Sequence, residues 1–167
     1  MKARCIAHRG CHWNCFENTK QAFEAAVKGD YFGVEMDIHL TKDKKWIIHH
    51  DPDFLSKGKK VVIKDEKMAD LLKMPLDNEW NYKATCPTLT EYLSIVKGSG
   101  KRPIIEIKPK NPSFHHLKQV LYSLLVSTKI QSSYLEYVVQ QCRAVSVWHP
   151  LEDVRFQARF KDRQLQA

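Results

Sequence analysis

The sequence predicts an α/β fold in a single domain, and three features of the chain lead to this prediction. Short apolar runs typical of strands alternate with longer segments in which apolar residues recur every three or four positions. Gly and Pro fall mainly between these segments, where they interrupt regular structure. No internal repeat and no low-complexity stretch breaks the alternation. We therefore expect strands and helices that follow one another along the chain.

The order of the expected elements follows from these patterns. Strand-like composition is found at residues 3–8, 33–40, 46–50 and 103–108, and residues 134–142 fit either a strand or a helix. Helical periodicity is found at residues 68–73, 88–97 and 114–129, and in a segment that Asn18 or Thr19 can cap and Gly29 can end. A long lysine-rich connection covers residues 52–87.

Composition places the chain among ordinary globular domains. It has 167 residues, of which 43% are hydrophobic and 28% charged, and this balance excludes a disordered or fibrous protein. No apolar run approaches the ~18 residues of a membrane-spanning helix, so we expect no transmembrane segment. The 5 cysteines are odd in number and irregularly spaced, which favours reduced thiols and a cytoplasmic location.

Basic residues outnumber acidic ones, 27 against 19, for a formal net charge of +8. This excess would attract a phosphate-bearing or otherwise anionic ligand, although scattered lysines also serve simply to solvate a surface. No stripe of basic and aromatic residues accompanies the excess, so we expect no nucleic-acid partner.

Acidic side chains lie in two segments that otherwise have the composition of buried strands. Because strand side chains alternate, Glu35, Asp37 and His39 share one face of their strand, and Glu106 and Lys108 share a face of another. Two carboxylates on one strand can simply face water, and Lys108 can form an internal ion pair with Glu106. Burying acids in apolar strands is costly without a cation, however, and converging carboxylates suit a hard divalent ion such as Ca²⁺ or Mg²⁺.

Two histidines stand where expected strands end. His8 closes the first strand and precedes Arg9, and His50 closes the strand that precedes Asp51. Imidazole titrates near neutral pH, so two histidines at strand ends could act as base and acid on opposite sides of a phosphodiester. Arg9 offers a planar fork of donors for phosphate oxygens. We expect His49, on the opposite strand face, to point away from the site.

A series of short motifs runs through the first two thirds of the chain. The motifs are Ala7-His8-Arg9-Gly10, Glu17-Asn18-Thr19, Gly33-Val34-Glu35-Met36-Asp37, Thr41-Lys42-Asp43, His50-Asp51-Pro52, Pro87-Thr88-Leu89 and Ile105-Glu106-Ile107-Lys108. Each is short, but their order and spacing together resemble the glycerophosphodiester phosphodiesterase family, over residues 3–110.

The resemblance implies a TIM-type (β/α) barrel and the metal-dependent hydrolysis of small-molecule glycerophosphodiesters to glycerol 3-phosphate and an alcohol. The implied roles are a divalent cation, Ca²⁺ or Mg²⁺, held by Glu35, Asp37 and Glu106; acid and base catalysis by His8 and His50; phosphate contacts from Arg9 and Lys108; and support from Glu17 and Asn18. The resemblance leaves open which histidine is the acid, and whether the glycerol 2-hydroxyl or water attacks phosphorus.

The chain is short for such a fold. A TIM-type barrel takes roughly 250 residues, so we expect an incomplete barrel with about its first four or five strands. In this interpretation residues 1–130 form the partial barrel, and residues 131–167 are an unassigned segment, divergent or truncated. We expect self-association through the open edges of the sheet. The alternative to an enzyme is a catalytically inactive barrel fragment that can still bind a divalent cation.

A different interpretation places zinc on Cys11, His12 and Cys15 together with His8. Their spacing matches no common zinc motif such as a pair of cysteines two residues apart. We therefore expect an oxygen-ligand site instead.

Overall fold

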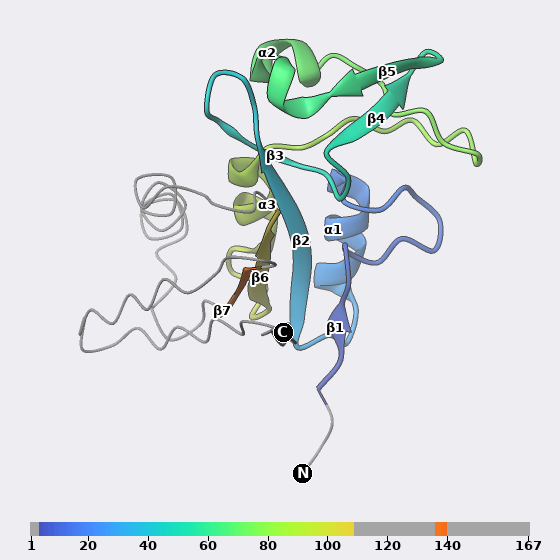
Figure 1. The fold of residues 1–167 in the computed structure, drawn as a ribbon. Helices are drawn as coiled ribbons and strands as arrows, with labels where there is room; N and C mark the ends of the chain where they lie inside the picture. Colours follow the sequence, from blue (N-terminus) through green and yellow to red (C-terminus); the bar gives the residue numbers. More distant parts are fainter. Residues whose placement is uncertain (1–3, 109–135, 140–167) are drawn as a thin grey trace, which may run out of the picture.

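A parallel sheet forms the centre of the protein (Figure 1). The computed structural model describes residues 4–108 and 136–139. The parallel strands are β1 (Ile6–Ala7), β2 (Gly33–Leu40), β6 (Arg102–Ile107) and β7 (Glu136–Val139), and they lie side by side in that order. Each new parallel strand is therefore added next to the previous one along the chain, which is the arrangement that starts a (β/α) barrel.

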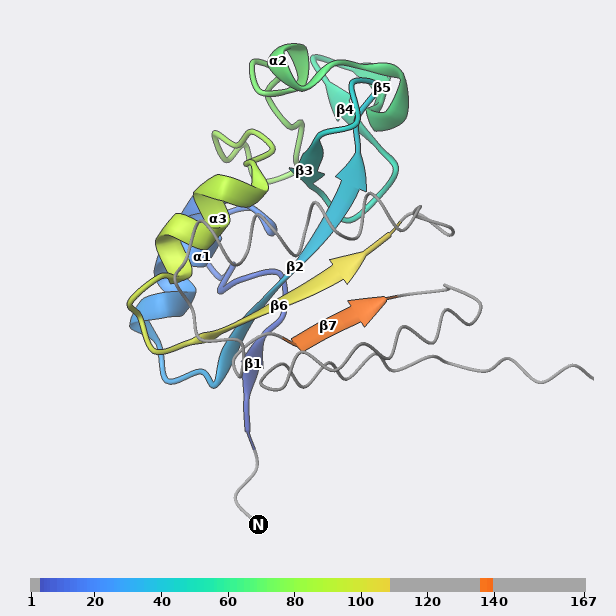
Figure 2. The ribbon, with the colours of Figure 1, turned by 90° about the vertical axis from the view of Figure 1, so that its left-hand side faces the viewer.

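Two helices cover one face of this sheet (Figure 2). They are α1 (Lys20–Lys28), capped by Thr19 and ended by Gly29, and α3 (Leu89–Val96), which begins with a capping box between Thr88 and Glu91.

The helices pack against each other and against β2. The rings of Phe23 and Tyr92 meet edge to face with their centroids 4.9 Å apart, and the Tyr92 hydroxyl donates to the backbone oxygen of Val34 at 2.6 Å. Tyr92, Phe23 and Val34 are fully buried in the main apolar core, together with Met36 and Ile105 on the strands. Because strand side chains alternate, the core covers one face of β2 and the acidic residues lie on the other.

The expected strand at residues 46–50 is not one of the parallel strands. Its counterpart is β3 (Trp46–Ile48), which pairs antiparallel with β2. The connection from β2 is a tight turn in which the backbone N–H of Thr41 donates to Lys45 O at 2.9 Å and Lys44 has a φ of 58°. So short a turn allows only an antiparallel neighbour, because a parallel strand requires a crossover of a dozen or more residues. The expected strand or helix at residues 134–142 contains β7, the fourth parallel strand.

Of a small unit between β3 and α3, the sequence predicted the helix at residues 68–73 but not the hairpin that precedes it. The unit contains the hairpin β4 (Asp53–Ser56) and β5 (Lys59–Val62), the short helices η1 (Ile63–Asp65) and α2 (Met68–Leu71), and a second apolar core of its own. Lys57 and Gly58 make the hairpin turn with φ values of 50° and 74°. Two consecutive positive φ values are typical of the two-residue turn whose twist suits a hairpin.

The expected helix at residues 114–129 lies outside the described residues. Within residues 4–108 and 136–139, no helix is long and apolar enough to cross a membrane.

Candidate functional site

Three carboxylates meet on the two neighbouring strands β2 and β6. Asp37 stands opposite Glu106 in the parallel register, and Glu35 lies one alternation earlier on the same face of β2. One oxygen from each carboxylate lies within 4.8 Å of the others. Glu35 and Asp37 are buried and Glu106 is partly buried. The structure thus brings together the residues that the sequence suggested as cation ligands.

Glu35 carries the strongest sign that the cluster is built for a cation. Its Oε2 accepts the backbone N–H of Arg9 at 2.8 Å, but its buried Oε1 has no hydrogen-bond partner among the described residues. Burial and, secondarily, the charge of Asp37 raise the pKa of Glu35 to about 8. A buried carboxylate beside other carboxylates is stable as an anion only if a positive charge compensates it. The donor set therefore fits a hard divalent ion, which prefers carboxylate oxygens.

Lys108 and Arg9 partly balance the charge of the cluster. The Lys108 ammonium is 2.7 Å from Glu106 Oε1 and 3.0 Å from Asp37 Oδ1, and Arg9 Nε is 3.5 Å from Asp37 Oδ2. Burial lowers the pKa of Lys108, but the hydrogen bonds to Glu106 and Asp37 outweigh it, so the pKa is raised. The internal ion pair considered from the sequence is therefore present. A phosphate contact from Lys108 remains a prediction.

Asn18 holds Asp37 more directly than the supporting role expected for it. Its side-chain amide donates to Asp37 Oδ2 at 2.8 Å, and its Oδ1 accepts the backbone N–H of Asp37 at 3.3 Å. Asn18 is buried and has a φ of 53°, a left-handed conformation that Asn tolerates better than most residues. Glu17, next to it, accepts from Arg9 Nη1 at 2.8 Å. The turn before α1 thus fixes both a ligand candidate and the guanidinium.

His8 lies at the edge of the cluster. Its Nε2 is 4.0 Å from Glu35 Oε2, and its side chain is 65% exposed. Burial and the neighbouring Arg9 lower the pKa of His8. A neutral imidazole that is open to solvent can accept a proton from a substrate or a water molecule. The following turn needs Gly10, because a Cβ there would lie 2.7 Å from the backbone of Ala22 and its φ is +81°.

His50 and His49 both lie beyond the end of β3, so strand alternation does not set their directions. The Nδ1 of His50 is 2.8 Å from Asp51 Oδ1, which leaves Nε2 as the nitrogen for proton exchange. His49 is buried, packs on Phe54 with ring centroids 5.4 Å apart, and has Nδ1 3.0 Å from Asp51 O. The expectation that His8 and His50 face each other across a substrate remains a prediction.

The zinc interpretation is wrong for the described residues. Among residues 4–108, the His, Cys, Asp and Glu side chains close enough to share one ion are Glu35, Asp37 and Glu106. Cys11 instead accepts from the Tyr31 hydroxyl at 3.6 Å, and Cys15 Sγ lies 3.6 Å from the backbone oxygen of Cys11. His12 is exposed.

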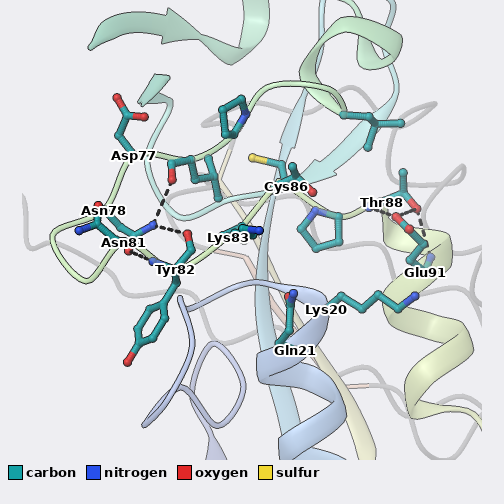
Figure 3. A pocket seen from close by; sticks show the side chains of 16 residues that line it. Lys20, Gln21, Asp77, Asn78, Asn81, Tyr82, Lys83, Cys86, Thr88 and Glu91 are labelled. Carbon is teal, nitrogen blue, oxygen red and sulfur yellow. Dashed lines mark hydrogen bonds between the residues drawn. The ribbon is translucent and has the colours of Figure 1, made fainter. Parts of the chain in front are cut away.

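A separate hollow of about 750 Å³ lies between the first turn of α1, the start of α3 and residues 72–88 (Figure 3). Lys20, Lys83 and Asn81 are among its polar lining residues. None of the residues expected in the catalytic site lines it. The hollow is therefore distinct from the carboxylate cluster.

Together, the parallel strands, the helices that follow them and the acidic cluster define a (β/α)-barrel protein with a candidate cation site. Residues 8–162 match the Glycerophosphoryl diester phosphodiesterase family, and the chain belongs to this family. The resemblance found in the sequence is thus confirmed.

Among similar sequences, the chain is 34% identical to a glycerophosphodiester phosphodiesterase of Caldanaerobacter subterraneus over 113 residues, which are 65% of this chain and 46% of that protein. It is 34% identical to an uncharacterised protein of Mycoplasma genitalium over 119 residues, 70% of this chain and 50% of that one. The chain spans about half the length of the curated relatives it matches.

Solved structures of the family confirm the fold. A glycerophosphodiester phosphodiesterase from Parabacteroides distasonis has a TM-score of 0.64 at 25% identity, over 81% of this chain and 56% of that one. An Oleispira antarctica phosphodiesterase in complex with the product sn-glycerol-3-phosphate has a TM-score of 0.63 at 24% identity, over 87% and 69% of the two chains. The expected TIM-type barrel, present in part, is therefore confirmed.

Proposed function

We propose that this chain hydrolyses glycerophosphodiesters to glycerol 3-phosphate and an alcohol, with a divalent cation held by Glu35, Asp37 and Glu106. The observation that carries the proposal is the convergence of these three carboxylates, with one buried oxygen of Glu35 left without a hydrogen-bond partner. Membership of the family and the product named in the Oleispira antarctica complex support the choice of substrate class.

The cation, when bound, would neutralise negative charge on the phosphate oxygens and lower the pKa of a coordinated hydroxyl or water. Oxygen ligands alone suit Ca²⁺ or Mg²⁺. Asn18 and Arg9 keep Asp37 in place through its Oδ2, and the backbone N–H of Arg9 does the same for Glu35. These contacts hold the ligand carboxylates in position before substrate arrives.

His8 and His50 are the groups that we assign to proton transfer. His8 is solvent-accessible beside Glu35, and the lowered pKa keeps its imidazole neutral at neutral pH. His50 has Nδ1 engaged by Asp51, so its Nε2 can give or take the proton. One of them removes the proton of the nucleophile and the other protonates the departing alkoxide, each worth ~10² to 10⁴ in rate.

The nucleophile is either the glycerol 2-hydroxyl or water. Attack by the hydroxyl would produce a cyclic glycerol phosphate that water then opens, whereas direct attack by water would not. Phosphorus NMR of the reaction, recorded at early times, distinguishes the two routes through the signal of the cyclic phosphate.

Activity on glycerophosphocholine is the direct test. We expect release of glycerol 3-phosphate and choline in the presence of Ca²⁺ or Mg²⁺, and no release in EDTA. Glu106→Gln should lower activity and raise the cation concentration that activity requires, because one anionic ligand is lost. His12→Leu, at an exposed position outside the cluster, should match the wild type. Hydrolysis that is equally fast in EDTA would refute the role of the cation.

The second candidate is a catalytically inactive barrel fragment that still binds the cation. It is favoured by the extent of the match, which covers about half of the curated relatives, and by a parallel sheet of four strands in the described residues. Calorimetric binding of Ca²⁺ without any turnover of glycerophosphocholine would establish this alternative.

We also propose a cytoplasmic location. Within the described part of the chain, Cys5, Cys11, Cys15 and Cys86 are free thiols, as expected in a reducing compartment. Fractionation of cells that express the tagged protein tests it.

A further inference from the structure

The imidazole of His39 contacts the backbone of His50. His39 lies on β2, two residues beyond Asp37, and therefore on the strand face that carries the acidic cluster. Its Nε2 is 3.0 Å from the backbone oxygen of His50. A carbonyl oxygen can only accept a hydrogen bond, so Nε2 must carry the hydrogen.

His39 has no place among the candidate cation ligands. In the described residues, the group that can share one ion consists of Glu35, Asp37 and Glu106. The hydrogen bond to His50 therefore explains why a polar side chain stands at position 39, on the acidic face of β2. The side chain is only partly exposed, so its hydrogen bond is shielded from competition with water.

The position of His50 depends on contacts other than the backbone pairing of β3 with β2. β3 ends at Ile48, and the last backbone bond that continues its pairing with β2 is from His49 N to Asp37 O, at 3.2 Å. Beyond that bond, the hydrogen bonds of His50 in the described residues are the one from His39 to its backbone oxygen and the one between its Nδ1 and Asp51.

We propose that His39 is a positioning residue for the proton-transfer histidine His50. Through its Nε2–H it ties the main chain of His50 to β2, so that one strand both supplies cation ligands and sets where the second imidazole stands. A displacement of about 1 Å at a reacting group can cost ~10²-fold in rate, so this tether matters for kcat. The catalytic part of the inference rests on the proposed function, and the hydrogen bond itself does not.

Three variants separate the donor role from simple packing. His39→Leu removes the donor but retains apolar volume. His39→Gln replaces it with an amide whose N–H₂ can reach nearly the same point. His12→Leu is the matched control, because His12 is an exposed histidine in the β1–α1 loop. Calorimetric titration with Ca²⁺ and thermal melting accompany the kinetics on glycerophosphocholine.

We expect kcat to fall at least ~10-fold in His39→Leu, with KM and Ca²⁺ affinity close to wild type, and to recover within about threefold in His39→Gln. The control should match the wild type. Equal losses in the Leu and Gln variants, or no loss in the Leu variant, would overturn the proposal.

Nitrogen-15 NMR of labelled histidine tests the tether without turnover. The wild-type spectrum should show His39 with hydrogen on Nε2, and the ring signals of His50 should shift in His39→Leu but stay in place in His39→Gln. If the wild type does not hydrolyse glycerophosphocholine, the proposed function fails, while these spectra still decide on the tether. A His39 Nε2 without hydrogen, or unmoved His50 signals in the Leu variant, would refute it.

Discussion

Replacing Glu35 by Gln should stabilise the cation-free protein at pH 8 while removing its response to Ca²⁺. Glu35 is only 7% exposed, and burial followed by the charge of Asp37 raises its pKa to about 8. A glutamine can keep the bond that the backbone N–H of Arg9 makes to Oε2, because its amide oxygen also accepts. Its N–H₂ group would then replace the unpartnered Oε1 and face the remaining carboxylates, to which it can donate.

The sign and size of the effect follow from the raised pKa of Glu35. Below the unfolded pKa, about 4.5, folded and unfolded chains both hold the proton, so no stability difference arises. As pH rises from 4.5 towards 8, the unfolded chain releases its proton while the folded chain retains it, and the free energy of unfolding falls. At about 1.4 kcal/mol per pH unit, this loss amounts to at most about 5 kcal/mol, and local relaxation reduces it to a few kcal/mol.

Urea unfolding followed by circular dichroism at pH 5, 6, 7 and 8 measures the effect. In EDTA, the difference between Glu35→Gln and wild type should grow with pH in favour of the variant. Taking the difference removes the contributions of histidines that titrate in both proteins. Saturating Ca²⁺ should then stabilise the wild type and leave the variant unchanged. A variant that is less stable than wild type throughout this pH range in EDTA would refute the reasoning from the raised pKa of Glu35.

Other expectations follow from the same geometry. Glu106→Gln should weaken Ca²⁺ binding roughly tenfold or more in calorimetry, because one anionic ligand is lost; unchanged affinity would remove Glu106 from the site. His50→Ala should lower kcat by ~10² to 10⁴, whereas buried His49→Ala should mainly lower the free energy of unfolding, by ~1 to 3 kcal/mol; equal kinetic losses would contradict this division. Tyr92→Phe should cost ~1 to 3 kcal/mol in urea unfolding, because the buried bond to Val34 is lost. If the barrel is incomplete, as expected from the sequence, light scattering should detect species larger than the 19.5 kDa monomer that increase with concentration, because an incomplete barrel has open sheet edges; a monomer at all concentrations would contradict this expectation.

Alternation along strands made the acidic cluster predictable from the sequence. Glu35 and Asp37 are two residues apart in an apolar strand, so their shared face was certain once the strand was recognised. Bringing Glu106 beside Asp37 required β6 to pair with β2; the resemblance implied only that these residues share a cation, and the register shows the pairing. The cap at Thr19 and the capping box at Thr88 were likewise local signals.

Contacts that depend on loop conformation were not predictable in the same way. The two hydrogen bonds between Asn18 and Asp37 form with a left-handed φ at Asn18, and nothing in the motif specifies that conformation. The hairpin turn at Lys57 and Gly58 lacks the Asn-Gly or Asp-Gly pair that usually announces one. His39 did give a signal, since it shares the acidic face of β2, but its partner is a backbone oxygen, which leaves no trace in the sequence.

Arg9 acts on the cluster through its main chain as well as its guanidinium, and this limits what alanine scanning can reveal about it. The φ of 54° turns its peptide N–H toward Glu35, while the guanidinium reaches Glu17 and Asp37. An alanine at this position would remove both side-chain contacts and leave the peptide donor in place. The measured loss would therefore underestimate what Arg9 contributes to the cluster. Exchanging the peptide N–H for an ester oxygen by chemical synthesis would measure the contribution of the main chain, since the ester keeps the side chain and removes the donor to Glu35.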